Sequence, residues 1–146
     1  MNNNKSIALY IDDGRKETND LREFLRMLKD QNYNPLIIIN NLGTFISDFP
    51  TVCSDALWDF RGPIIADAFI AARFLLEYPT HFPKYFWVRE ADWTNPNFDA
   101  IDQIKVHQSM EITKIFSNKE FMDTYNKVWG MQNCKIMQDF INGETF

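Results

Sequence analysis

The regular alternation of short apolar runs with helical segments is the feature that most constrains the fold of this chain. Residues 6–11 are apolar and stop abruptly at Asp12, which is typical of a buried strand that leads into a loop. Leu and Phe recur at i, i+3, i+4 and i+7 over residues 21–28, which predicts an amphipathic helix. Residues 36–39 are continuously apolar, as in a strand covered on both faces. Strand, helix and strand within about 35 residues predict a βαβ unit with a right-handed crossover.

The rest of the chain continues this alternation. Apolar, β-branched runs predict further strands at 63–66, 84–88, 103–107 and 134–137, and helical spacing predicts helices at 68–78, 110–116 and 121–129. The segment 68–78 is apolar nearly all round, so we expect a buried helix there. We expect residues 40–62 to be irregular, with a short strand near Val52-Cys53 and a helical turn near Leu57-Trp58.

This pattern, which contains no internal repeat, predicts one α/β domain over residues 1–146. We expect a doubly wound, mostly parallel sheet with helices on both faces, a Rossmann-like arrangement. In such a sheet, ligands bind outside the carboxyl ends of the strands, near the point where the strand order reverses.

Composition narrows the function classes. The 146 residues include 15 Lys and Arg against 20 Asp and Glu, a formal charge of −5, so extensive nucleic-acid binding through a basic face is not expected. No apolar run approaches the roughly 18 residues of a membrane span, and the first five residues do not read as a signal peptide. We therefore expect a soluble cytoplasmic protein that does not bind membranes, with Cys53 and Cys134 as buried, reduced thiols.

Four polar segments follow predicted strands and are expected to meet at one edge of the sheet. They are Asp12-Asp13-Gly14-Arg15, Asp67, the segment from Arg89 to Trp93, and the segment from His107 to Ser109. One interpretation is that charged residues end strands simply because strands end at water. The other is a ligand site formed by Asp12, Asp13, Gly14, Arg15, Arg89 and Trp93, with helix N-termini near 17–20 and 67–69 that could donate N–H groups to an anion. The chain contains no glycine-rich pyrophosphate motif.

The candidates for catalysis are weaker, and the sequence leaves their roles open. Asp67, Glu90 and Asp92 could act as a carboxylate nucleophile or base, and His107 as a general base that titrates near neutral pH. The alternative for His107 is a strand-end histidine bonded to nearby backbone. Glu90 and Asp92 have a spacing that could hold a divalent cation, but two acids with one spacer are common by chance. We assign no metal site and no cofactor.

Aromatic residues cluster around the same segment. Alternation along the predicted strand 84–88 places Phe86 and Trp87 in the core, one against each helix layer. Trp93 follows the strand in a loop, so it is the better candidate for stacking on a sugar or a base.

Two longer segments carry a family resemblance. The segments 62–76 (GPIIADAFIAARFLL) and 84–93 (KYFWVREADW) resemble the N-terminal Rossmann-like half of two-domain (GT-B) glycosyltransferases, including glycosyltransferase-like proteins of tailed phages. The segments 103–116 and 134–140 resemble the later strands and helix of that half. The resemblance implies binding of a glycan acceptor or a nucleotide sugar, and for a viral protein a location in the host cytoplasm.

The chain differs from that family in a way that changes the function we expect for it. The glycosyltransferases hold the donor on a second domain, which would begin where this sequence ends, at Phe146. The chain would then be an acceptor-binding half that depends on a partner chain, or a small transferase. The alternative is a non-enzymatic interaction protein with a degenerate Rossmann-like fold that binds a host or viral protein or a second copy of itself.

Overall fold

Within the residues that the structure describes, seven parallel strands form one sheet. The structure is a computed structural model that describes residues 5–11, 18–40, 45, 47–130 and 133–143. The strand order is β3-β2-β1-β4-β5-β6-β7, and every neighbouring pair is parallel, which confirms the predicted doubly wound sheet. The strands are β1 (Lys5–Ile11), β2 (Tyr33–Ile39), β3 (Thr51–Cys53), β4 (Ile64–Ala66), β5 (Lys84–Trp87), β6 (Ile112–Phe116) and β7 (Cys134–Ile136).

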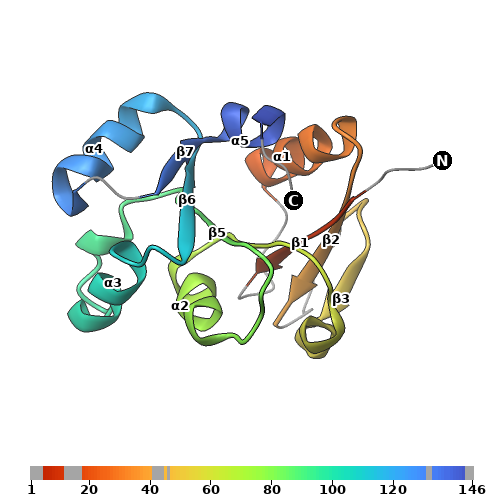
Figure 1. Ribbon diagram of the computed structural model, residues 1–146, viewed down its shortest axis with the longest axis horizontal. Helices are drawn as coiled ribbons and strands as arrows, with labels where there is room; N and C mark the ends of the chain where they lie inside the picture. The colour runs from red at the N-terminus through yellow and green to blue at the C-terminus, as the bar shows by residue number, and fades with distance from the viewer. Residues whose placement is uncertain (1–4, 12–17, 41–44, 46, 131–132, 144–146) are drawn as a thin grey trace.

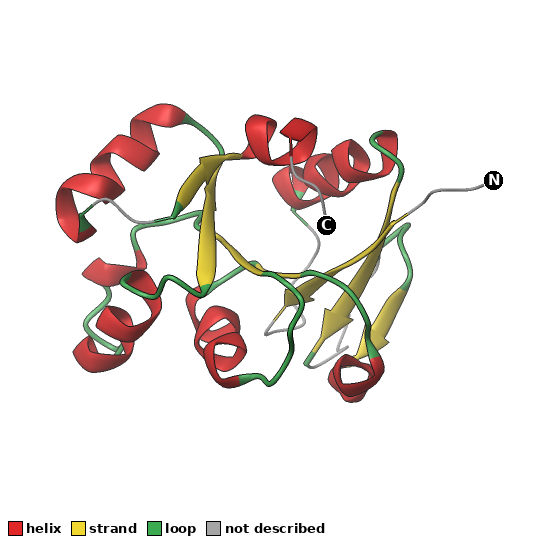
Figure 2. Cartoon of the chain, viewed as in Figure 1, coloured by secondary structure: helices red, strands yellow, loops and turns green. Residues whose placement is uncertain are grey.

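Helices cover both faces of the sheet (Figure 1). They are α1 (Asn19–Asp30), α2 (Phe69–Glu77), α3 (Ala100–His107), α4 (Lys119–Trp129) and α5 (Met137–Gly143), with two short 3-10 helices, η1 (Ser54–Asp59) and η2 (Asp92–Thr94). Helices α1 and α5 pack on one apolar layer, whereas η1, α2, α3 and α4 contribute to the other. Figure 2 shows the strands lying between these two groups of helices.

The first βαβ unit follows the prediction closely. The hydroxyl of Thr18 accepts the N–H of Leu21, which caps α1, and the apolar stripe of α1 is buried against the sheet. Strand β2 begins at Tyr33 and not at Leu36, so Pro35 lies inside it. Strand β3 pairs with β2 only from Ile37 onward, so the missing N–H of Pro35 costs no bond on that side.

Two predicted elements were wrong because their types are exchanged. The segment 103–107 belongs to helix α3 and not to a strand, and the segment 110–116 contains strand β6 and not a helix. The carboxylate of Asp99 accepts the N–H groups of Ile101 and Asp102, a capping signal that fixes the start of α3. Strand β6 is buried except for the half-buried Thr113, and it pairs with β5, as its β-branched residues favour.

Two expectations about burial also need correction. Helix α2 is buried on one side only, because Ile70 is 50% and Phe74 42% exposed. Cys53 is exposed and Cys134 only partly buried, because each lies in a short strand at an edge of the sheet.

Phe86 and Trp87 are buried in opposite layers, as predicted. Within the described residues, no helix is long and apolar enough to cross a membrane.

Candidate functional site

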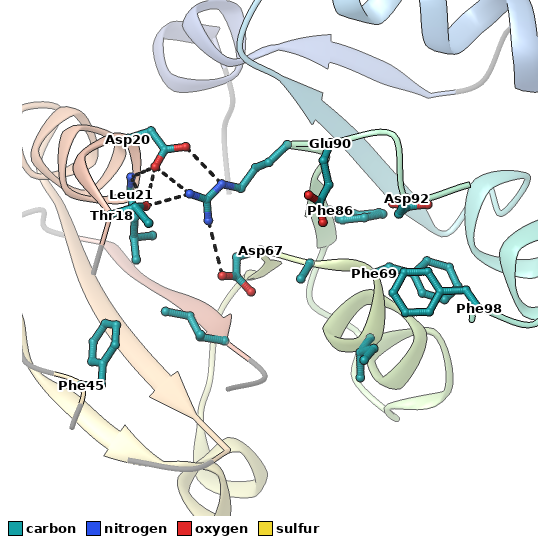
Figure 3. Close-up of a pocket in the computed structure, with 14 residues that line it drawn as sticks. Thr18, Asp20, Leu21, Phe45, Asp67, Phe69, Phe86, Glu90, Asp92 and Phe98 are labelled. Carbon is teal, nitrogen blue, oxygen red and sulfur yellow. Dashed lines mark hydrogen bonds and ion pairs between the residues drawn. The ribbon is translucent and has the colours of Figure 1, made fainter. Parts of the chain in front are cut away.

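A pocket of about 370 Å³ opens at the carboxyl ends of β1, β4 and β5. The strand order reverses between β1 and β4, so the pocket lies where doubly wound sheets bind ligands. Its walls come from the end of β1, the start of α1, the β4–α2 junction and the segment after β5 (Figure 3). The lining residues are Ile11, Thr18, Asp20, Leu21, Phe45, Asp67, Ala68, Phe69, Ile70, Phe86, Arg89, Glu90, Asp92 and Phe98.

The side chain of Arg89 contacts residues from three of these walls. One of its terminal nitrogens lies 2.6 Å from Oδ1 of Asp20 and 2.8 Å from the hydroxyl of Thr18, and its Nε lies 3.2 Å from Oδ2 of Asp20. The other terminal nitrogen lies 3.6 Å from Oδ2 of Asp67, and the guanidinium rests over the Trp87 ring at 4.5 Å. The guanidinium therefore joins the start of α1 to the ends of β4 and β5, as the dashed lines in Figure 3 show.

The electrostatics at Asp20 follow from this contact. Burial raises the pKa of Asp20, but hydrogen bonds from Arg89 and Thr18 outweigh that effect, so the pKa lies below its ordinary value. Asp20 also accepts the N–H of Leu21 at 2.9 Å. The N–H of Leu21, in the first turn of α1, is therefore already bonded to the side chains of Thr18 and Asp20.

The lining of the pocket is rich in hydrogen-bond acceptors. Among the described lining residues there are four carboxylates and one guanidinium, which is itself bonded to two of the four. The acids are Asp20, Asp67, Glu90 and Asp92. Phenylalanine rings from residues 45, 69, 86 and 98 supply apolar surface. Such a pocket fits a ligand that donates hydrogen bonds and also presents an apolar face.

Behind the pocket wall lies a buried polar chain that the sequence did not predict. Nε2 of His107 lies 2.6 Å from Oδ1 of Asp92, and its Nδ1 lies 3.0 Å from the hydroxyl of Tyr125. Side-chain exposure is 0% for His107 and 3% for Asp92. Burial raises the pKa of Tyr125, so its phenol stays protonated. The three side chains come from η2, α3 and α4, and no sequence pattern predicted that these elements would meet.

No protein-family model, curated protein or solved structure matches this chain. The resemblance to glycosyltransferases therefore stays a hypothesis.

The structure brings together some of the predicted site residues and separates others. Asp67, Arg89, Glu90 and Asp92 line the pocket, as expected of residues that follow β4 and β5. His107 ends helix α3 and bonds to Asp92 and Tyr125, so the expectation of a strand-end histidine was wrong. Trp93 is not among the lining residues, and its ring packs edge-on against His107 at 5.7 Å.

Other predictions lie outside what the structure describes, or were missed. Asp12, Asp13, Gly14 and Arg15 fall outside the described residues. Within those residues, no three His, Cys, Asp or Glu side chains are grouped as metal ligands would be. Asp20, Phe45 and Phe98 also line the pocket, although the sequence did not point to them individually. For Asp20, the available signal was the helix N-terminus predicted near residues 17–20.

Proposed function

We propose that this protein binds a neutral saccharide, of the glycan-acceptor type, in the pocket at the carboxyl edge of the sheet. The observation that carries the proposal is the combination of four carboxylates with phenylalanine rings in one pocket at the reversal of strand order. Carboxylate oxygens accept hydrogen bonds from sugar hydroxyls, and aromatic rings pack against the C–H face of a sugar ring. A volume of about 370 Å³ suits a mono- or disaccharide.

The charges in the pocket favour an acceptor over a nucleotide-sugar donor. A diphosphate would face several carboxylates, and the guanidinium of Arg89 is bonded to Asp20. The side chains of Thr18 and Asp20 accept the N–H of Leu21 at the start of α1, so that helix end has less to offer an anion. These charges support the acceptor-binding role that the resemblance implies. In that role, a partner chain supplies the donor, and a glycosyltransferase-like activity arises only in the complex.

Calorimetric titration tests the proposal. The ligands are glucose, galactose, N-acetylglucosamine and maltose, compared with UDP-glucose and UDP. We expect saturable binding of at least one neutral saccharide, and weaker binding of UDP. Asp67→Asn should weaken the saccharide about tenfold, because a charged acceptor becomes a neutral amide.

Asp102→Asn is the matched control. Asp102 also pairs with an arginine, since its Oδ1 lies 2.9 Å from Nε of Arg73, but it lies on α3 and does not line the pocket. Its substitution should leave the affinity unchanged. Preferential binding of UDP, or the absence of heat with every saccharide, would refute the proposal.

A second candidate function, protein interaction, is supported by a shallow apolar groove on the α2–α3 side. The groove is lined by Leu76, Ile104 and Met110, and Met110 is 68% exposed. Lys105 and Glu111 lie at the same groove. Because it carries both signs of charge, a second copy related by a two-fold axis could pair Lys105 with Glu111, so we propose self-association as the interaction.

Sedimentation velocity tests the second candidate. Wild type should dimerise reversibly, and Ile104→Lys should stay monomeric. Val128→Lys is the control, because Val128 on α4 is similarly exposed and lies outside the groove. A wild type that is monomeric at every concentration would remove this candidate.

A further inference from the structure

We propose that Asp92 is a specificity-determining acceptor in the pocket, and that His107 and Tyr125 are positioning residues that hold its carboxylate for a hydroxyl of the ligand. This inference rests on the proposed saccharide binding and deepens it. It starts from the placement of Asp92, which lines the pocket although its side chain is only 3% exposed. Figure 3 shows Asp92 beside Phe86 and Phe69 at one end of the pocket.

The two carboxylate oxygens of Asp92 have different surroundings. Oδ1 accepts a hydrogen bond from Nε2 of His107 over 2.6 Å. Within the described part of the chain, Oδ2 receives no hydrogen bond, and it is not among the side-chain atoms that are both buried and unsatisfied. A carboxylate oxygen that reaches the pocket without an intramolecular donor is an acceptor for a ligand. It selects a hydroxyl or amine and disfavours a phosphate or carboxylate.

The hydrogen-bond chain fixes the direction of each donor. An ionised carboxylate only accepts, so Nε2 of His107 carries the hydrogen that it shares with Asp92. On the other side of the ring, the Tyr125 hydroxyl lies 3.0 Å from Nδ1 and 3.2 Å from the carbonyl oxygen of His107. Whichever of these two acceptors takes the single phenol proton, Nε2 remains the donor to Asp92.

Packing holds the imidazole in this orientation. The ring stacks on Trp129 at 4.8 Å and meets Trp93 edge-on at 5.7 Å. Phe69 and Phe86, which also line the pocket, lie on its other sides at 5.9 Å each. Rotation of the imidazole away from Asp92 would require these rings to move. Because His107 is fully buried, it acts on a ligand only through Asp92.

The test uses Asp92→Asn and Tyr125→Phe, with Asp102→Asn as the control on α3. The probes are glucose, galactose, N-acetylglucosamine and maltose, and the imidazole ¹⁵N resonances of His107 are recorded with and without each saccharide. We expect Asp92→Asn to weaken saccharide binding about tenfold or more, because the ligand hydroxyl loses a charged acceptor. Tyr125→Phe should weaken it about threefold while leaving Asp92 present.

The imidazole resonances supply a readout that a purely structural role would not change. A saccharide bound to wild type should shift the Nε2 resonance of His107, although the sugar does not touch that ring, because engaging Oδ2 weakens the Oδ1 contact. Binding by wild type together with unchanged affinity in folded Asp92→Asn would overturn the inference and leave the proposed function standing. Should Asp92→Asn not fold, an unshifted Nε2 resonance at saturation of wild type overturns it. If no saccharide binds wild type, the proposed function and this inference both fail.

Discussion

A buried lysine on the strand next to one edge of the sheet makes the free energy of unfolding depend on pH in a calculable way. Lys114 lies on β6 between β5 and β7, and the residue is fully buried. Its Nζ donates to the carbonyl oxygen of Ser109 over 2.6 Å, and Cys134 is its partner in register on β7. Burial lowers the pKa of Lys114 from 10.5 to about 8, and the nearby Cys134 only partly opposes this.

The sign and the size follow from linkage. In the unfolded chain the amine titrates near 10.5, so between pH 8 and 10.5 the unfolded state binds more protons than the folded state. The free energy of unfolding therefore rises with pH across this window. With a folded pKa of about 8, the rise between about pH 7 and about pH 9.5 amounts to about 2 kcal/mol.

Urea unfolding of wild type, Lys114→Met and Lys105→Met at these two pH values measures the effect. Lys114→Met removes the titrating group, so wild type should gain about 2 kcal/mol more than this variant on going to the higher pH. Lys105 is exposed on α3, and its substitution should leave the wild-type rise in place. Burial raises the pKa of Tyr85 from 10 to about 12, so this tyrosine lowers stability mainly between those two pH values, above the chosen range. Equal rises in wild type and Lys114→Met would refute the reasoning.

Two further predictions concern the pocket wall and one glycine. Arg89→Met should lower the free energy of unfolding by about 1 kcal/mol at pH 7. The pKa of Asp20 is depressed below 3.8, so the stability that this residue contributes is present above that pH and is lost as the pH falls through its folded pKa. An acid titration should show this loss of stability in wild type and a smaller loss in Arg89→Met. Gly62→Ala should cost about 2 kcal/mol or more in a thermal melt, because φ is +153° and a Cβ would lie 2.8 Å from the carbonyl oxygen of Ser6. Gly143→Ala should cost far less, because among the described residues the new Cβ meets no atom within 4 Å apart from those of its own helix and chain neighbours. Equal costs would contradict the steric argument.

The parallel sheet could be predicted because its strands are short and continuously apolar. A run such as Ile37–Ile39 has no polar face, which favours a strand buried on both sides, and the helix after β1 has a clear apolar stripe. The exchange of α3 and β6 shows where this reasoning failed. Short segments that mix polar and apolar residues can fit both the helical period and the strand period. The start of helix α3 is determined by the carboxylate of Asp99, which caps it.

In the candidate site as well, the sequence was enough to place some residues and not enough to place others. Asp67 and Arg89 could be placed because they directly follow strands whose carboxyl ends share one edge. The contacts among Asp92, His107 and Tyr125 depend on how η2, α3 and α4 pack, and residues 15 and 18 positions apart in the sequence carry no periodic signal of that packing. Trp93 was expected to contact a ligand because it lies in a loop, but its ring packs inward against His107. A tryptophan in a loop can pack inward as readily as toward a ligand.

Mapping amide chemical shifts during a saccharide titration tests the central claim most directly. Asp67, Ala68 and Phe69 at the β4–α2 junction, together with Glu90 and Asp92, should shift progressively and saturate with a neutral sugar. Gln108 and Glu111, at the groove on the α2–α3 side, should not. Shifts confined to that groove, or no saturating shifts with any saccharide, would contradict the account.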